Sequence, residues 1–139
     1  MKKFLVLFVS VLLLVGCGNK EAQNPNDVVC SGTVTEGGET YEMKLTAHTK
    51  DNKVETVDAT MVFGKDETAK QMCDLFNLMN NFTEKEEDKI DVTCDGKSVT
   101  VKGFEKYADD EDNKLAGMPK EDFVKYFQEG TNDYKLTCK

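Results

Sequence analysis

Tryptophan and arginine are absent from this chain, and histidine occurs once, at position 48. Without arginine, every basic side chain is a lysine, which cannot make the bidentate contacts that favour phosphate recognition. The net charge is −8 at pH 7, whereas a nucleic-acid-binding surface is basic. We therefore expect an acidic, solvated protein with no nucleic-acid partner.

Groups that carry catalysis or hold cofactors are also scarce. A hydrolase needs a nucleophile with a base beside it, and the one candidate base, His48, falls on the outward side of an expected strand. A calcium loop needs alternating ligands, a glycine at the bend and a distant glutamate, and the acidic run at residues 109–113 lacks that pattern. No two cysteines have the Cys-x-x-Cys spacing of zinc sites. We expect no catalytic residue, no cofactor and no metal site.

The first 16 residues have the three parts of a secretory signal. Two lysines supply positive charge, residues 4–15 form an apolar run broken only by Ser10, and small Gly16 follows. The run is shorter than the roughly 20 apolar residues that a membrane-spanning helix needs. The alternatives considered are an ordinary cleaved signal peptide with an incidental cysteine and an uncleaved anchor.

The stretch Leu14-Val15-Gly16-Cys17 resembles the lipobox of bacterial lipoproteins. This resemblance implies that residues 1–16 are a lipoprotein signal peptide cleaved after Gly16, and that a diacylglycerol is attached to the Cys17 sulfur. Each buried CH₂ of an acyl chain contributes about 0.8 kcal/mol, so two or three chains hold a protein to a bilayer. We expect residues 17–26 to be a tether and residues 27–139 one extracytoplasmic domain. The partner implied is the cell membrane, which on a Gram-positive cell means attachment at the outer surface.

Four cysteines remain when Cys17 is set apart. An even number of cysteines in a small exported domain predicts two disulfides. All four lie on expected inward faces, so we interpret them as structural. We prefer the pairs Cys30–Cys138 and Cys73–Cys94, with Cys30–Cys94 and Cys73–Cys138 as the alternative. Reduced thiols are a third interpretation.

Period-two alternation and turn residues predict antiparallel hairpins. With Gly37-Gly38 as the first loop, Val28 lies opposite Ala47, and all pairs stay on one apolar face. After a turn at residues 50–53, Ala47 lies opposite Val57, with a loop or bulge at residues 54–56. A third hairpin has Asp95-Gly96 as its loop, which places Cys94 opposite Lys97 and Val92 opposite Val99. A last strand spans residues 134–138.

Apolar spacing of three and four residues predicts two amphipathic helices. The first begins near Asp66 and ends near Asn81, and we expect Leu75 and Leu78 to widen its buried stripe. The second begins at Pro119 and ends at Gly130. The fold class is therefore α+β, with an antiparallel sheet of five to six strands built from hairpins and two helices packed on one face.

The order of these elements resembles the YehR-type family of small bacterial lipoproteins. The resemblance rests on the lipobox cysteine, the paired strands around Asp51-Asn52-Lys53-Val54, the helix that starts at Asp66-Glu67-Thr68-Ala69-Lys70, and the hairpin of residues 90–101. It implies an antiparallel sheet with helices packed on it, and it implies no known activity.

The sequence favours a binding or interaction module of the cell envelope over an enzyme. Its partner would be an envelope protein or a small ligand. A small envelope hydrolase is one alternative, because 26 acidic residues could include a carboxylate pair for glycoside cleavage. A purely structural surface protein is the other.

Overall fold

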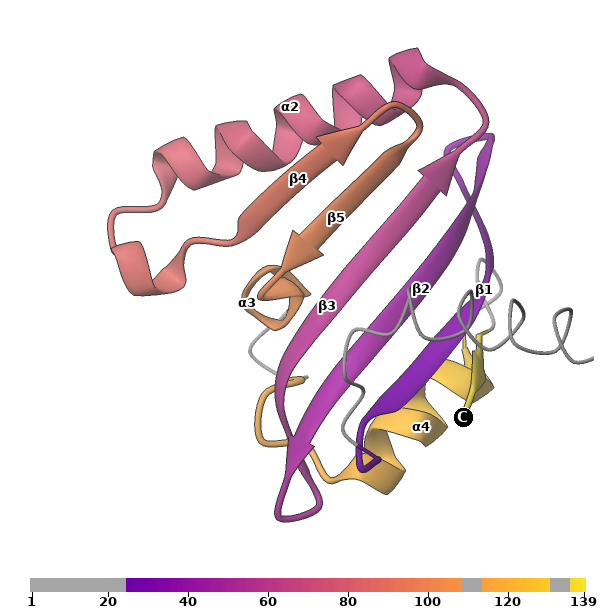
Figure 1. The fold of residues 1–139 in the computed structure, drawn as a ribbon, viewed down its shortest axis with the longest axis vertical. Coiled ribbons are helices and arrows are strands. Elements are labelled where there is room, and N and C mark those ends of the chain that lie inside the picture. Colours follow the sequence, from indigo (N-terminus) through magenta and orange to yellow (C-terminus); the bar gives the residue numbers. More distant parts are fainter. Residues whose placement is uncertain (1–24, 109–113, 131–135) are drawn as a thin grey trace, which may run out of the picture.

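Six antiparallel strands form one open sheet in the order β4-β5-β3-β2-β1-β6 (Figure 1). The computed structural model describes residues 25–108, 114–130 and 136–139. Cys17, the lipobox and the acidic run at residues 109–113 therefore lie outside the described residues. The elements are β1 (Val28–Glu36), β2 (Glu39–Lys50), β3 (Lys53–Phe63), α2 (Asp66–Phe82), η1 (Glu86–Asp88), β4 (Asp91–Asp95), β5 (Ser98–Lys102), α3 (Phe104–Ala108), α4 (Lys120–Glu129) and β6 (Thr137–Cys138). The expected α+β class with an antiparallel sheet is confirmed.

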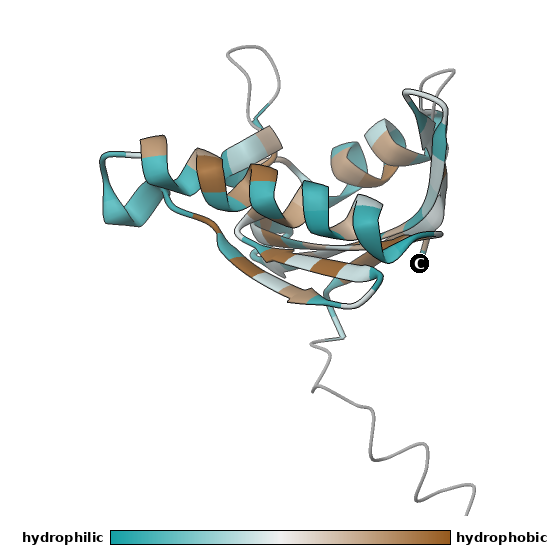
Figure 2. Ribbon diagram, turned by 90° about the horizontal axis from the view of Figure 1, so that it is seen from above, coloured by the Kyte–Doolittle hydropathy of each residue, from teal (hydrophilic) through white to brown (hydrophobic). Residues whose placement is uncertain are grey.

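The three α-helices of the described residues, α2, α3 and α4, lie on one face of the sheet (Figure 2). Helix α2 packs on β4, β3 and β5, whereas α4 packs on β1, β6 and β3. Because side chains alternate along a strand, the inward half forms the core, and no described helix covers the outward half. We call this second side the uncovered face. The largest fully buried side chains are Phe123, Leu45, Leu136, Val28, Val54, Val57, Val99 and Val101.

The first two hairpins have the predicted registers. Val28 pairs with Ala47, and Ala47 pairs with Val57 on the other side of β2. The predicted bulge is also present, because the register of β2 and β3 shifts between His48 and Thr49. The loops are Gly37-Gly38 and Asp51-Asn52, and in each loop both residues have positive φ. This is the requirement of a type I′ turn, which matches the twist of paired strands.

The predicted register of the third hairpin is wrong by two residues. Cys94 pairs with Val99 and Val92 with Val101, so the two-residue loop is Gly96-Lys97. Gly96 has φ 56°, and Lys97 is not among the residues with positive φ. Glycine with positive φ at the first loop position is typical of a type II′ turn, which competes here with the type I′ turn expected for Asp-Gly.

One prediction about inward faces is also wrong. Leu75 and Leu78 of α2 are 46% and 51% exposed, because only Ala69, Cys73 and Phe76 of this helix reach the sheet deeply enough to be buried. Cys94 does lie on the helix-covered side of the sheet, as predicted, because it pairs with Val99 and is bonded to Cys73 of α2. It is nevertheless exposed, because β4 is the edge strand.

A short helix, α3, was not predicted from the sequence. It supplies a hydrogen-bond acceptor to β3 beyond the point where β3 stops pairing with β5. Gly103, with φ 80°, turns the chain out of β5 and into α3. The Glu105 carboxylate, 5% exposed, accepts a hydrogen bond of 2.7 Å from the backbone N–H of Val57. This contact supplies an acceptor just beyond Asp58, where the ladder between β3 and β5 ends. A buried N–H without such an acceptor would cost about 1–3 kcal/mol.

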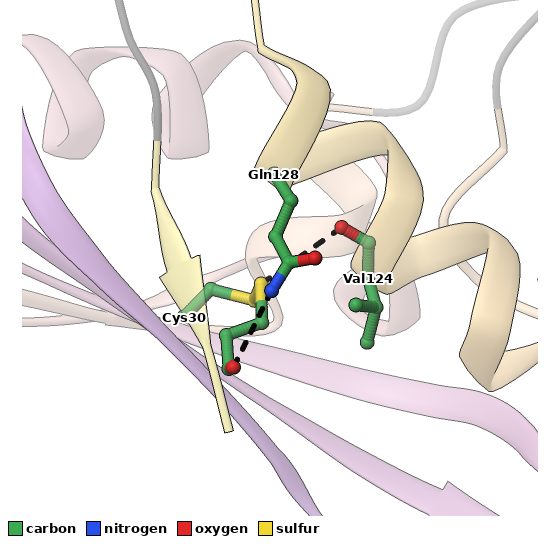
Figure 3. Close-up of a disulfide and its surroundings, with 4 residues drawn as sticks. Cys30, Val124 and Gln128 are labelled. Atoms are coloured by element: carbon green, nitrogen blue, oxygen red, sulfur yellow. Dashed lines mark hydrogen bonds between the residues drawn. A yellow bond between two sulfur atoms is a disulfide. The ribbon is translucent and has the colours of Figure 1, made fainter.

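Two disulfides are present, as expected, and they join Cys30 to Cys138 and Cys73 to Cys94. Of the two pairings weighed from the sequence, this is the preferred one. Cys30 and Cys138 are partners in the β1–β6 register. Gln128 of α4 lies against this bond (Figure 3) and donates a hydrogen bond of 3.4 Å to the Cys138 carbonyl oxygen. The second bond joins the buried face of α2 to the edge strand β4.

Every described element, both disulfides and the whole buried core lie after residue 26. A chain that begins at Gly18 therefore keeps all of them. Among the described residues, no helix is both long and apolar enough to cross a bilayer.

Candidate binding surface

The uncovered face of the sheet carries a line of hydroxyl groups across all six strands. Strand pairing places one residue from each strand in this line, and five of the six are threonine or serine. We call it the hydroxyl row, and it consists of Thr93, Thr100, Thr60, Lys44, Ser31 and Thr137. The Thr60 and Thr100 hydroxyl oxygens lie 3.4 Å apart. Hydroxyl groups both donate and accept hydrogen bonds, so this face suits polar contacts.

A shallow groove crosses the middle of this face. Its volume is about 400 Å³, within the range of roughly 300–1,000 Å³ found for ligand pockets. Its lining contains one cation, Lys44, and one carboxylate, Glu42, beside hydroxyl groups and the exposed Val62. The lining residues are Ser31, Gly32, Thr33, Glu42, Met43, Lys44, Thr60 and Val62.

His48 lies on the same face as Lys44 and is held between two carboxylates. Its Nδ1 is 2.8 Å from Asp27 Oδ2, and its Nε2 is 2.8 Å from Asp58 Oδ2. The side chains of His48, Asp27 and Asp58 are 41%, 5% and 30% exposed. The second oxygen of Asp27 accepts a hydrogen bond from the Thr49 backbone N–H. The cluster therefore ties the residue that precedes β1 to β2 and β3.

The surroundings of His48 favour its charged form. Burial lowers the pKa of His48, but the hydrogen bonds to Asp58 and Asp27, together with their negative charges, raise it by more in total. The pKa of His48 is therefore raised above its usual value. As an imidazolium it donates both N–H groups to the two carboxylates, so neither nitrogen is free to accept a proton from a nucleophile in this arrangement.

His48 lies on an outward strand face, as predicted from the sequence, but its two carboxylate partners were not predicted. The predicted pairing of Val28 with Ala47 puts Asp27 directly opposite His48. Likewise, the predicted pairing of Ala47 with Val57 brings Asp58 next to the same point. The predicted strand registers therefore already placed both carboxylates beside His48.

Comparisons with known proteins gave one result. No protein-family model, curated protein or solved structure matches the chain.

The remaining expected site residues fall into two groups. The four domain cysteines are paired in the disulfides described above, and Cys17 lies outside the described residues. Within the described part of the chain, no group of three or more His, Cys, Asp or Glu side chains has an arrangement that could hold a metal ion.

The His48 cluster should make stability depend on pH. The folded-state pKa of His48 lies above the ordinary histidine value of about 6.5. The stability that the cluster contributes is therefore fully present below about pH 6.5 and is lost as the pH rises through the folded-state pKa. We expect His48→Gln to lower the free energy of unfolding by up to about 1 kcal/mol near pH 5.5, since exposure screens the pair, and by less near pH 8.5. Urea unfolding at the two pH values measures this difference.

Thr56→Val is the matched control, because Thr56 pairs with His48 across β2 and β3 but carries no ionisable group. Its effect should be the same at both pH values. An effect of His48→Gln that does not change with pH, or that grows as the pH rises, would contradict the charged cluster.

Proposed function

We propose that this protein is a lipid-anchored extracytoplasmic lipoprotein whose domain binds a polar ligand of the cell envelope on the uncovered face of its sheet. The lipobox pattern that ends at Cys17 supports the anchor. The observation that carries the binding proposal is the groove of about 400 Å³ on that face, with Lys44 and Glu42 in its lining.

The chemistry of the groove indicates the class of ligand. Its hydroxyl groups pair with hydroxyl or amide groups, while Lys44 and Glu42 pair with charges of opposite sign. The described residues that line the groove include no aromatic side chain, so its lining favours polar contacts over stacking of a flat ring. A glycan or peptide strand of the cell wall, which carries hydroxyl, amide and charged groups together, fits these contacts.

The charge of the mature chain is consistent with this location. Without the two lysines of the signal, 16 lysines are set against 26 acidic residues, a net charge of about −10. An acidic domain is repelled by an anionic membrane surface, which favours a position above the bilayer where wall polymer is reached.

Lys44→Glu should weaken ligand binding at least about tenfold, because it removes a charge-assisted hydrogen bond and adds a repelling carboxylate. The probe is soluble peptidoglycan fragments added to the ¹⁵N-labelled chain that begins at Gly18, followed by NMR. We expect amide shifts at Ser31, Thr33, Lys44 and Thr60, with the wild-type shifts lost in the variant.

Lys102→Glu is the matched control, because Lys102 is an exposed lysine on the same face outside the groove lining. It should bind as the wild type does. The binding proposal would be overturned if the fragments caused no shifts, if the shifts lay on the helical face, or if the two lysine variants were weakened equally.

A further inference from the structure

Helix α2 carries more apolar surface than the sheet covers. Its exposed side includes Leu75, Leu78 and Phe82, which are 46%, 51% and 78% exposed. These residues recur with the half-buried Thr68 and the exposed Gln71 at spacings of three, four, three and four. Alternating spacings of three and four place all five residues along one line of a helix. We call this line the α2 seam.

The spacing of the seam indicates what kind of surface covers it. A line of residues at alternating spacings of three and four is the pattern by which one helix packs along another. A lipid surface fits poorly, because the segment of residues 84–89, shortly after Phe82, carries four acidic side chains against two lysines and anionic lipid repels its net negative charge. The occupant expected is therefore another helix.

We propose that the α2 seam is the contact between two copies of this chain, with the two α2 helices packed antiparallel. In a symmetric antiparallel pair centred between Leu75 and Leu78, each Leu75 contacts Leu78 of the other copy. Gln71 then lies against Phe82 of the other copy. A two-fold axis brings the same patch of each copy together, so the seam serves as both sides of the contact.

The charges at the helix ends favour the antiparallel direction. In a parallel pair the acidic segments after Phe82 would meet. In an antiparallel pair, each acidic segment lies at the beginning of the other α2, where the helix dipole is positive. The charged side chains at that end balance: Lys65, Lys70, Asp66 and Glu67.

The exposed area predicts a weak dimer. The three apolar side chains expose on the order of 300 Å², comparable to the largest apolar patch of a typical monomer. A stable interface buries about 800 Å² on each partner, so the seam supplies the centre and the flanking polar residues supply the rim. Dissociation in the micromolar range is expected, and confinement of two anchored copies to one bilayer would raise their effective concentration.

The Cys73–Cys94 disulfide determines to which side of α2 the seam faces. Cys73 lies on the buried side of α2, and its bond to β4 limits rotation of the helix about its own axis. The seam is thereby held away from the sheet. Because α2 covers one face of the sheet (Figure 2), the dimer leaves the groove on the opposite face open.

Sedimentation equilibrium on the chain that begins at Gly18 tests the dimer over a concentration series from micromolar to millimolar. Wild type should pass from monomer to dimer, and Leu78→Asp should weaken the association at least about tenfold, since it buries a charge at the centre of the contact. Val62→Asp is the matched control, because Val62 is 40% exposed on the opposite face, and it should dimerise as the wild type does.

Phe82→Glu is a second seam variant that keeps the test decisive if Leu78→Asp fails to fold. The direction of packing is tested with a spin label introduced at Glu67 through an unnatural amino acid. The two labels should lie about 28 Å apart along the helix axis in an antiparallel pair, given a rise of about 1.5 Å per residue. A wild-type chain that stays monomeric throughout, a dimer unaffected by either seam variant, or labels in close proximity would overturn the proposal. Failure of peptidoglycan binding would leave it unaffected.

Discussion

Replacing Cys30 and Cys138 together by alanine is expected to lower the free energy of unfolding by about 4.8 kcal/mol, by loop-closure entropy. The two cysteines are 108 residues apart, so their bond removes much of the freedom of the unfolded chain. The bond also holds β6, a strand of only two residues, against β1. Urea unfolding without reductant measures the loss.

The second disulfide is the control for this prediction. Cys73 and Cys94 are 21 residues apart, so replacing both by alanine should cost about 3.3 kcal/mol on the same loop-closure basis. Cys94 is exposed whereas Cys30 is fully buried, which adds to the difference in the same direction. A Cys73/Cys94 variant that proves the less stable of the two would contradict the greater stabilisation expected from the Cys30–Cys138 bond, which closes the longer loop.

The second large effect concerns Cys17. Replacing Cys17 by alanine should abolish incorporation of an alkyne-tagged fatty acid into the protein in living cells, because the lipobox cysteine is the expected attachment point. Acyl chains contribute about 0.8 kcal/mol per buried CH₂, so loss of two or three chains removes the attachment to the bilayer. In-gel fluorescence after click labelling measures incorporation.

The four domain cysteines provide the matched control for labelling. The Cys30→Ala, Cys138→Ala double variant removes two sulfurs that are joined to each other and should keep full labelling per molecule. Label that persists in the Cys17 variant would place the acyl group elsewhere and contradict the lipobox interpretation.

The registers of β1, β2 and β3 could be predicted because two independent constraints agree. Alternation places one set of residues on the apolar face, and the turn residues Gly37-Gly38 and Asp51-Asn52 favour loops that give the same pairing. A slip of one residue would turn the apolar set outward, so the core itself selects the register.

The third hairpin shows where this logic fails. A shift of two residues between β4 and β5 keeps Val92 and Val99 on the same face, so alternation cannot distinguish the predicted register from the actual one. Only the turn decides, and Gly96 has the positive φ needed for a loop at either Asp95-Gly96 or Gly96-Lys97.

The exposed part of α2 could not be predicted for a related reason. Helical spacing shows that Leu75 and Leu78 continue the apolar side of the helix, but it does not show how wide a strip the sheet covers. Local sequence patterns also do not indicate contacts between segments that are distant in the sequence. The buried bond between Glu105 and Val57 joins residues 48 positions apart, and no local feature of the sequence signals it.

We propose that this domain is attached to a membrane by a lipid on Cys17, and the intact mass of the protein extracted from membranes is the measurement that tests this attachment. The expected mass is that of residues 17–139 with two disulfides, plus a diacylglyceryl group and any further acyl chain on the new amino terminus. A mass equal to the full 139-residue chain, or to an unacylated chain cut at another residue, would contradict it.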